Sequence, residues 1–522
     1  MTTPALPPTY RPEPRHIELG DAFYDVVAPA RFPEHRLRWR NQRAAAEVGL
    51  DLLDDGAWVD HLARFRPLPQ NLPLPLALRY HGHQFRHYNP DLGDGRGFLY
   101  AQLRAGPRLL DLGTKGSGTT PWSRGGDGRL TLQGAVRELL SAEMQEALGV
   151  PVSRVLSVVE TGEALDRHDE PSPTRAAVMV RLQHSHIRYG TFQRLAYLRD
   201  KANLRTLVEH SVELHFPTLA GAPDLPSALL AAAARAQART VGAWMAAGYV
   251  HGVLNTDNMN ITGESFDFGP WRFAPDLDPD FTAAYFDQNG LYSYGRQPEA
   301  VHWNLQQLAM ALAQIGDPPA LARALEGYLA HTTAAMAANL RWRLGLAPAG
   351  AAADQELLQV FTRVLRESRL PLDRVCFDWF GGGAAAARAL AGPLGALYQR
   401  RWFAPLRTIL EARAPNAQGS APDAIFEQPQ PCAMLIDEVR ALWAAVAERD
   451  DWGPVVEKVA AVRRLGAALG EGPLVAAWRE GSLWEDGLSL DGPGEEPKGR
   501  AGQGGAPPPS DAAAEGLPAT AR

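Results

Sequence analysis

The stretch HGVLNTDNMNITGESFDFGP, residues 251–270, decides how the rest of the chain is interpreted. It begins with His251, has Asn258 seven residues later and continues to Asp267-Phe268-Gly269. An asparagine amide and an aspartate carboxylate both offer the oxygen atoms that magnesium and manganese prefer as ligands. The stretch therefore indicates a metal-dependent site.

Kinases have a comparable segment, in which His-x-Asp is followed by an asparagine five residues after the aspartate and then by Asp-Phe-Gly. In this chain the position of that aspartate, which serves kinases as the proton acceptor, is Val253. A carboxylate stands instead at Asp257, directly before Asn258. The segment thus indicates phosphate chemistry in which the metal ligands are retained and the base has moved or been lost.

The composition is that of an ordinary globular enzyme, with 522 residues of which 45% are hydrophobic and 21% are charged. A formal charge of −7 provides no basic field, so we expect no nucleic-acid partner. The chain has two cysteines, no visible signal peptide and no apolar run long enough to span a bilayer. We therefore expect a cytoplasmic protein without a membrane partner.

Strand signals come early in the chain and helix signals come later. Residues 97–103, 109–116 and 178–182 are typical of strands. Apolar spacing and terminal glycines predict helices within 131–149, 227–248 and 303–316, and further amphipathic helices over much of 320–480. This order predicts an α+β chain with a protein-kinase-like two-lobed fold, a strand-rich N-lobe preceding a helix-rich C-lobe.

Four regions follow from this order. We expect an N-terminal extension (1–75), a kinase-like N-lobe (76–185), a helical C-lobe that carries the metal-binding segment (186–490) and a disordered tail (491–522) rich in Gly, Pro and Ala.

The front part supplies three further pieces of a phosphate site in kinase order. LGDGRG, 92–97, is a glycine-rich loop whose backbone N–H groups can approach a phosphate, with Arg96 adding charge. Lys115 follows at a strand end, and Glu138 stands 23 residues later on the next helix. In kinases such a lysine contacts phosphate oxygens and such a glutamate holds it in an ion pair. Their joint order is far more specific than any one of them.

These residues belong to longer segments that resemble the selenoprotein O family of protein adenylyltransferases, also called the SelO/YdiU family. The matching segments are YHGHQFRHYNPDLGDGRG (80–97), KGSGTTPWSRGGDGR (115–129), VRELLSAEM (136–144), VRLQHSHIRYGTF (180–192), GYVHGVLNTDNMNITGESFDFGP (248–270) and YSYGRQPEAVHWNLQQLAMAL (292–312). The chain departs from the family at Arg86, where glycine is common, and at Thr119, where arginine is common.

The resemblance implies a kinase-like fold that holds ATP in a reversed orientation and transfers AMP to hydroxyl side chains of proteins, with Mg²⁺ or Mn²⁺. It implies Asn258 and Asp267 as metal ligands and Asp257 as the proton acceptor. The residues that it implies at ATP are Gly93, Gly95, Arg96, Lys115, Asp127, Gly128, Arg181, Arg188 and Asp267.

Three alternatives stay open at this point. Spacing alone does not distinguish AMP transfer from ordinary phosphoryl transfer, and Val253 is compatible with a pseudoenzyme that binds ATP and acts as an interaction module. A third alternative is a transition-metal site built from two His-x-His pairs, which are His81 with His83 and His184 with His186.

Overall fold

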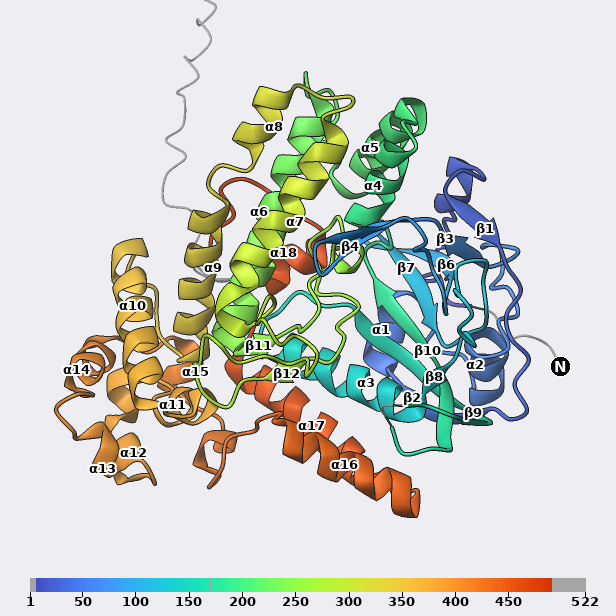
Figure 1. Cartoon of the computed structure of the whole chain (residues 1–522). Coiled ribbons are helices and arrows are strands. Elements are labelled where there is room, and N and C mark those ends of the chain that lie inside the picture. Colours follow the sequence, from blue (N-terminus) through green and yellow to red (C-terminus); the bar gives the residue numbers. More distant parts are fainter. Residues whose placement is uncertain (1–5, 169, 491–522) are drawn as a thin grey trace, which may run out of the picture.

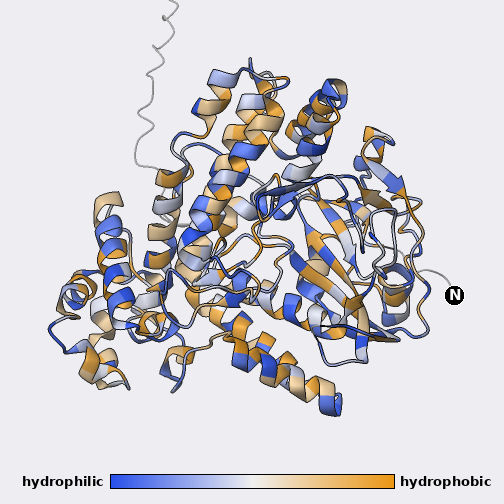
Figure 2. Ribbon diagram, in the orientation of Figure 1, coloured by the Kyte–Doolittle hydropathy of each residue, from blue (hydrophilic) through white to orange (hydrophobic). Residues whose placement is uncertain are grey.

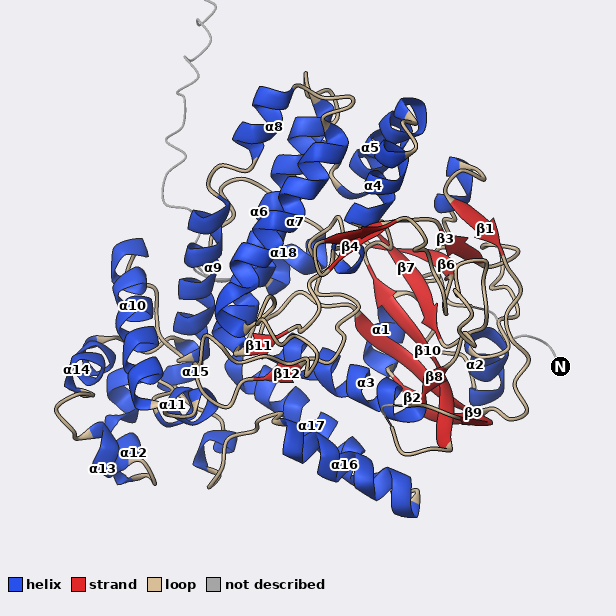
Figure 3. Cartoon of the chain, viewed as in Figure 1, coloured by secondary structure: helices blue, strands red, loops and turns tan. Residues whose placement is uncertain are grey.

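A single large antiparallel sheet and a set of helices occupy separate parts of the molecule (Figure 1, Figure 3). The computed structural model describes residues 6–168 and 170–490. The tail that we expected to be disordered, 491–522, lies outside the described residues. The α+β class predicted from the sequence is confirmed, because the sheet draws its strands from residues 24–183 and helices predominate from residue 189 onward.

The sheet has the strand order β1-β3-β6-β7-β10-β9-β2, with β8 paired to β10. Its strands are β1 (Tyr24–Val26), β2 (Arg36–Arg40), β3 (Leu76–Leu78), β6 (Leu99–Ala105), β7 (Arg108–Lys115), β8 (Leu130–Thr131), β9 (Arg154–Leu165) and β10 (Thr174–Gln183). The strands predicted at 97–103, 109–116 and 178–182 correspond to β6, β7 and β10. Residues 1–75, interpreted from the sequence as an extension, contribute β1 and β2 to this sheet.

Two hydrophobic clusters lie on opposite faces of the sheet. Because side chains alternate along a strand, Val178, Val180 and Leu182 of β10 pack with α1 (Gln42–Glu47) and α2 (Asp55–Leu62). Met179 points the other way and belongs to the cluster that includes α3 (Leu132–Ala147). Figure 2 shows hydrophobic and hydrophilic residues mixed along the strands of the sheet. The α3 face of the sheet is the one that turns toward the helical part.

Helix α3 confirms the helix predicted within 131–149. The Thr131 side chain caps its start by accepting a hydrogen bond from the Gly134 N–H, 3.0 Å away. Its end is followed by Gly149 at φ +74°, a left-handed conformation that favours glycine, and by Pro151. These local signals explain why this helix was predictable.

Helix α6 (Leu225–Ala247) runs through the centre of the helical part and is buried along most of its length. It ends at Gly248, φ +73°, and the chain passes directly into β11 (Tyr249–Val250), which pairs with β12 (Arg272–Phe273). The stretch 251–270 is therefore held between two paired strands. A second small sheet joins β4 (Gly82–Gln84) to β5 (His87–Asn89).

The remaining helices surround α6 or extend beyond it (Figure 1). They are α4 (Tyr189–Tyr197), α5 (Lys201–His215), α7 (Gln297–Leu312), α8 (Pro318–Ala324), α9 (Tyr328–Arg343), α10 (Ala351–Ser368), α11 (Leu372–Asp378), α12 (Ala386–Ala391), α13 (Gly395–Tyr398), α14 (Ala404–Ala412), α15 (Ala417–Ser420), α16 (Ile436–Arg449), α17 (Gly453–Leu469) and α18 (Val475–Glu480). Among the described residues, no helix has the length and apolar character needed to cross a membrane.

Candidate functional site

A cavity of about 790 Å³ lies where the sheet meets the segment 251–270. Its lining includes parts of the glycine-rich loop 92–97, the loop 122–129, the β9–β10 connection at 166–168 and the segment 253–269. It brings together all the site residues predicted from the sequence except Glu138, namely Gly93, Gly95, Arg96, Lys115, Asp127, Gly128, Arg181, Arg188, Asp257, Asn258 and Asp267.

Strand register places Lys115 and Arg181 on the same face of the sheet. Arg181 of β10 lies opposite Gly113 of β7, two residues before Lys115. Because side chains alternate, Lys115 and Arg181 face the cavity, whereas Leu112 and Val180 pack into the core on the other face. Two cations thus enter the cavity from neighbouring strands.

Lys115 forms the ion pair with Glu138 of α3 that the sequence predicted. Its ammonium contacts Glu138 Oε1 and lies 3.8 Å from Asp267 Oδ1. The side chains of Lys115 and Glu138 are only 12% and 7% exposed. Burial lowers the pKa of Lys115, and the two carboxylates oppose that effect. Glu138 lies behind the lysine and holds it over the cavity without lining the cavity itself.

Asp267 gathers three cations around one carboxylate. Arg181 Nη1 contacts Oδ1, Arg188 Nη1 donates to Oδ2 at 2.6 Å, and Lys115 is the third. Burial alone would raise the pKa of Asp267, but Arg181, Arg188 and Lys115 hold it well below its usual range. The backbone of Asp267 has φ +46°, in the left-handed region that few residues other than glycine adopt. An ionised carboxylate is therefore fixed at the centre of the cavity.

Arg188 links the start of α4 to the segment 251–270. Its guanidinium lies 4.6 Å from the ring centroid of Tyr80 and 4.4 Å from that of Phe266. It also donates to the Asp257 carbonyl at 2.7 Å and lies 3.3 Å from Asp94 Oδ1. The arginine is thereby fixed by two aromatic rings and by acceptors on two segments, 92–97 and 251–270.

Asp257 and Asn258 lie in a short 3₁₀ turn, Thr256–Asn258. Asp257 is 8% exposed, and its Oδ1 has no hydrogen-bond partner among the described residues. Burial raises the pKa of Asp257 to about 6, although Arg188 opposes the rise. Asn258 Nδ2 donates to the Val253 carbonyl at 3.0 Å, and no described residue donates to its amide oxygen. The turn therefore presents a carboxylate oxygen and an amide oxygen that the protein leaves unbonded.

Glycines allow the two loops at the cavity rim to pack tightly. A Cβ atom on Gly93 would lie 2.3 Å from Trp122 Cγ, and one on Gly128 would lie 2.2 Å from the Gly118 carbonyl carbon. Gly128 also has φ +69°. Larger residues at these positions would force the loops apart, which explains the need for glycine.

Arg96 and Asp127 lie at the solvent side of this rim, and both are exposed. Asp127 pairs with Arg167 at 2.9 Å. Burial tends to raise the pKa of Asp127, and its hydrogen bond with Arg167 lowers the pKa below the usual value.

The histidines of the two His-x-His pairs each form a hydrogen bond through the ring, and the four rings do not come together as ligands of one metal ion. Their ring contacts are His81 with Tyr88 at 2.8 Å, His83 with Gln193 at 2.8 Å, His184 with Glu264 at 2.8 Å and His186 with Asp111 at 3.2 Å. Across residues 6–168 and 170–490, no three His, Cys, Asp or Glu side chains stand together as potential metal ligands. The geometry gives no support to a transition-metal site built from these pairs.

The sequence matches a known protein family over most of its length. The family model described as "Protein adenylyltransferase SelO" matches residues 8–462. The chain belongs to the SelO family. The match covers the sheet, the segment 251–270 and most of the helical part.

Relatives in the SelO family are similar to this chain over most of their length. A protein of Synechocystis sp. (strain ATCC 27184 / PCC 6803 / Kazusa) named "Protein nucleotidyltransferase YdiU" is 42% identical over 480 residues, which cover 87% of this chain and 98% of that protein. Proteins with the same name from Gloeobacter violaceus and Trichormus variabilis are 39% and 46% identical. The first alignment covers 87% of this chain and 95% of the relative, and the second covers 69% and 74%.

Sequence reasoning missed five charged residues that line the cavity, which are Asp94, Arg124, Arg129, Asp166 and Arg167. Asp94 stands between the two glycines of the loop that was quoted, but only its burial and its contact with Arg188 reveal a role. Arg124 and Arg167 also line the cavity. A signal for Arg124 was available, since it lies within the family segment 115–129, whereas Arg167 lies in a connection without a motif.

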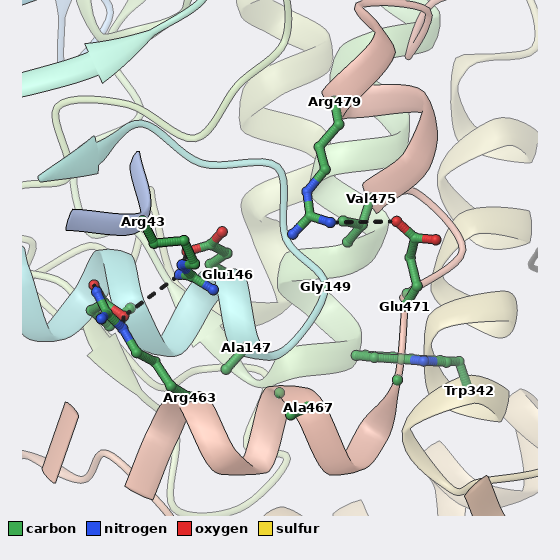
Figure 4. A pocket seen from close by; sticks show the side chains of 14 residues that line it. Arg43, Glu146, Ala147, Gly149, Trp342, Arg463, Ala467, Glu471, Val475 and Arg479 are labelled. Carbon is green, nitrogen blue, oxygen red and sulfur yellow. Dashed lines mark hydrogen bonds and ion pairs between the residues drawn. The ribbon is translucent and has the colours of Figure 1, made fainter. Parts of the chain in front are cut away.

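A second cavity, of about 430 Å³, lies between α3, α17 and α18 (Figure 4). Its three arginines are already paired, Arg43 with Glu146 at 2.5 Å, Arg463 with Glu143 at 2.6 Å and Arg479 with Glu471 at 3.5 Å. None of the site residues predicted from the sequence lines this second cavity. The cavity around Asp267 is the candidate active site of this SelO-family chain.

Proposed function

We propose that the chain transfers AMP from ATP to Ser, Thr or Tyr hydroxyls of proteins and releases pyrophosphate. The observation that carries the proposal is the convergence of Lys115, Arg181 and Arg188 on Asp267 in one cavity, with Asp257 beside them. Membership of a family of protein adenylyltransferases supports it. The partners are therefore ATP and protein substrates with hydroxyl side chains.

We further propose that the fold is protein-kinase-like and two-lobed. An N-lobe at 76–185 would carry the glycine-rich loop, Lys115 and Glu138, and a helical C-lobe at 186–490 would carry Asp257, with 1–75 as an N-terminal extension. The buried pair between a strand lysine and a helix glutamate supports this, because kinases use the same device to aim the lysine at phosphates.

The cations of the cavity suit a reaction that expels pyrophosphate. The leaving group carries about three negative charges, so fixed positive charge is the dominant stabilising effect in such a transition state. Lys115, Arg181 and Arg188 are held toward the cavity by ion pairs with Glu138 and Asp267. We assign ATP contacts to these three and to the rim residues Gly93, Gly95, Arg96, Asp127 and Gly128.

The donor atoms fit Mg²⁺ or Mn²⁺. Asp267 is an ionised carboxylate, and the Asn258 amide oxygen has no donor among the described residues. Mg²⁺ is often bound by one or two protein oxygens, with phosphate oxygens of the substrate among its other ligands. When bound, the ion neutralises charge that develops on the phosphates.

Asp257 is the proposed proton acceptor. Its buried Oδ1 has no partner among the described residues, so it is free to accept a hydrogen bond from an incoming hydroxyl. General-base help of this kind contributes roughly 10²- to 10⁴-fold, less than the cations. Val253 stands where kinases have their aspartate. The proton of the incoming hydroxyl would therefore be accepted by Asp257, four residues further along the same segment.

Two alternatives make different predictions in one experiment. Ordinary kinase-type phosphoryl transfer would attach the γ-phosphate of ATP to protein, and an ATP-binding pseudoenzyme acting as an interaction module would attach neither label. Protein is incubated with α-labelled or γ-labelled ATP, with and without Mg²⁺ or Mn²⁺. We expect stable incorporation of the α-label alone, dependent on the metal. Incorporation of the γ-label alone would overturn the proposal.

A further inference from the structure

Two neighbouring aromatic side chains project into solvent on the loop between β12 and α7. Tyr285 is 81% exposed and Phe286 is 47% exposed. Their ring centroids are 5.2 Å apart. Large rings more often bury their surface in the core, so this exposed adjacent pair is a candidate contact surface. We call these two residues the aromatic lip.

The loop that carries the aromatic lip packs directly on the segment 251–270. Gly252, the residue before Val253, has φ +87°, and a Cβ atom there would lie 3.0 Å from Ala283 Cβ. The same atom would lie 2.9 Å from Pro270 Cγ. The loop that carries the lip is therefore packed against the start of the segment that contains Asp257, where the two ends of that segment also meet.

A continuous row of contacts leads from the lip to the cavity. The Phe286 ring lies 5.9 Å from that of Phe85, which lies 5.0 Å from that of Tyr292. The Tyr292 hydroxyl and the Phe85 backbone N–H both donate to Asn255 Oδ1, at 2.9 and 3.0 Å. Asn255 lines the cavity and stands two residues before Asp257.

Phe85 is held in this row by a strained turn. Phe85 and Arg86 connect β4 to β5 with φ +49° and +65°, a conformation that bulky residues rarely adopt. Such strain persists only where the surroundings hold it, and it is concentrated at binding sites. The charges beside the turn are satisfied, since Arg86 pairs with Glu299 at 3.1 Å and stacks over Trp303 at 5.4 Å. The exposed rings of Tyr285 and Phe286 are what this surface offers to an apolar side chain of a partner.

We propose that the aromatic lip docks the acceptor segment of the protein substrate, and that this segment has an apolar or aromatic side chain close to the modified hydroxyl. The inference rests on the proposed AMP transfer, because a hydroxyl that reaches Asp257 from solvent brings its flanking residues over the mouth of the cavity. In this arrangement the cavity binds the hydroxyl that is modified, and the lip contacts the side chains that flank it in the substrate.

The test uses synthetic peptides with a central Ser, Thr or Tyr, flanked either by Leu and Phe or by Gly and Asn only. AMP transfer from α-labelled ATP is measured as kcat/KM for both sets. We expect the full-length protein to prefer the apolar set by about tenfold, the scale of a well-filled apolar pocket. The double variant Tyr285→Ala/Phe286→Ala should lose this preference while its Kd for ATP is unchanged.

Two control variants test whether the preference depends on the aromatic rings of the lip, and not on the Tyr285 hydroxyl or on the loss of any exposed aromatic residue. Tyr285→Phe keeps the ring and removes the hydroxyl, so it should keep the preference. Trp402→Ala removes an aromatic residue of similar exposure, 44%, next to α14, and it should also keep the preference.

Each contrary outcome has a distinct meaning. Equal transfer to both peptide sets by the unmodified protein, or a preference that survives in the double variant, overturns the docking proposal alone. Transfer to intact proteins without transfer to any peptide also overturns it, because the lip then fails to dock a segment. Absence of α-label on every peptide and protein refutes AMP transfer itself.

Discussion

Asp267 is the residue on which the charge balance of the cavity depends. Arg181 and Arg188 are 3% and 4% exposed, so removal of the carboxylate leaves two buried cations without their nearest counter-charge. We predict that Asp267→Ala abolishes AMP transfer and lowers the free energy of unfolding without ATP by about 3 kcal/mol. Transfer assays and urea unfolding measure the two effects.

The exposed aspartate Asp91, outside this cluster, provides the control. Asp91→Ala should leave both measurements near the values of the unmodified protein. Full transfer activity in Asp267→Ala would remove Asp267 from the mechanism. From the sequence alone the substitution is expected to affect activity only, because the ion pairs that make it destabilising become visible only in the fold.

At the scale of elements, Lys115 on β7 and Glu138 on α3 couple the sheet to a helix. The side chains of both are largely buried, so this pair differs from a surface pair worth about 0–1 kcal/mol. We predict that Lys115→Ala and Glu138→Ala each lower the melting temperature and the transfer rate. In the double variant the losses should be far from additive, since both substitutions disturb the same positioning. Losses in rate that simply multiply would show that the two residues act independently.

The rim loops offer a second test at this scale. Gly128 combines φ +69° with a close approach to Gly118, whereas Gly125 in the same loop has φ +80° and no atom within 4 Å of a built Cβ. Gly125→Ala thus introduces backbone strain alone, about 1 kcal/mol. We predict that Gly128→Ala also displaces the loop and weakens ATP binding by about tenfold or more, equivalent to about 1.4 kcal/mol. Equal Kd values for ATP in the two variants would show that the close packing is unimportant.

Elements with strong local signals were predictable from the sequence, and elements formed by distant pairing were not. Helix α3 has a capping threonine, helical spacing and a terminal glycine, and β6 and β7 are joined by a tight turn. By contrast, β2 acquires its place through pairing with β9, where Arg36 lies opposite Glu160. No local pattern specifies a contact across so long a stretch of chain, so the role of residues 24–40 in the sheet was missed.

The same distinction applies to the site. The motif residues were predictable because their spacing is local, and the Lys115–Glu138 pair followed from strand-to-helix order. Asp94 was missed since its role depends on the approach of Arg188, 94 residues away in sequence. The aromatic lip was missed because exposure is a property of the folded surface.

For the molecule as a whole, buried histidines should limit stability in acid. Burial lowers the pKa of His16 to about 3 and of His210 and His251 to about 4. Histidine in an unfolded chain has a pKa of about 6.5, so between about pH 6.5 and pH 4 the unfolded chain binds protons that the folded chain does not. The free energy of unfolding should therefore fall as the pH is lowered through this window, by up to about 1.4 kcal/mol per pH unit for each histidine.

Urea unfolding at about pH 7 and about pH 5 measures this effect. His16→Gln should reduce the loss on acidification, whereas the exposed His87→Gln should not. A urea midpoint that is independent of pH in this range would mean that the buried histidines are not responsible for acid sensitivity.

Attack at the α-phosphorus of ATP releases pyrophosphate, so the released product tests the proposed AMP transfer most directly. Pyrophosphate, ADP and the nucleotide attached to protein are quantified in one reaction with ATP and Mg²⁺. We predict that pyrophosphate appears in the same molar amount as protein-bound AMP and that ADP does not accumulate. Accumulation of ADP together with protein-bound phosphate, and no pyrophosphate, would contradict the account and assign the cavity to phosphoryl transfer.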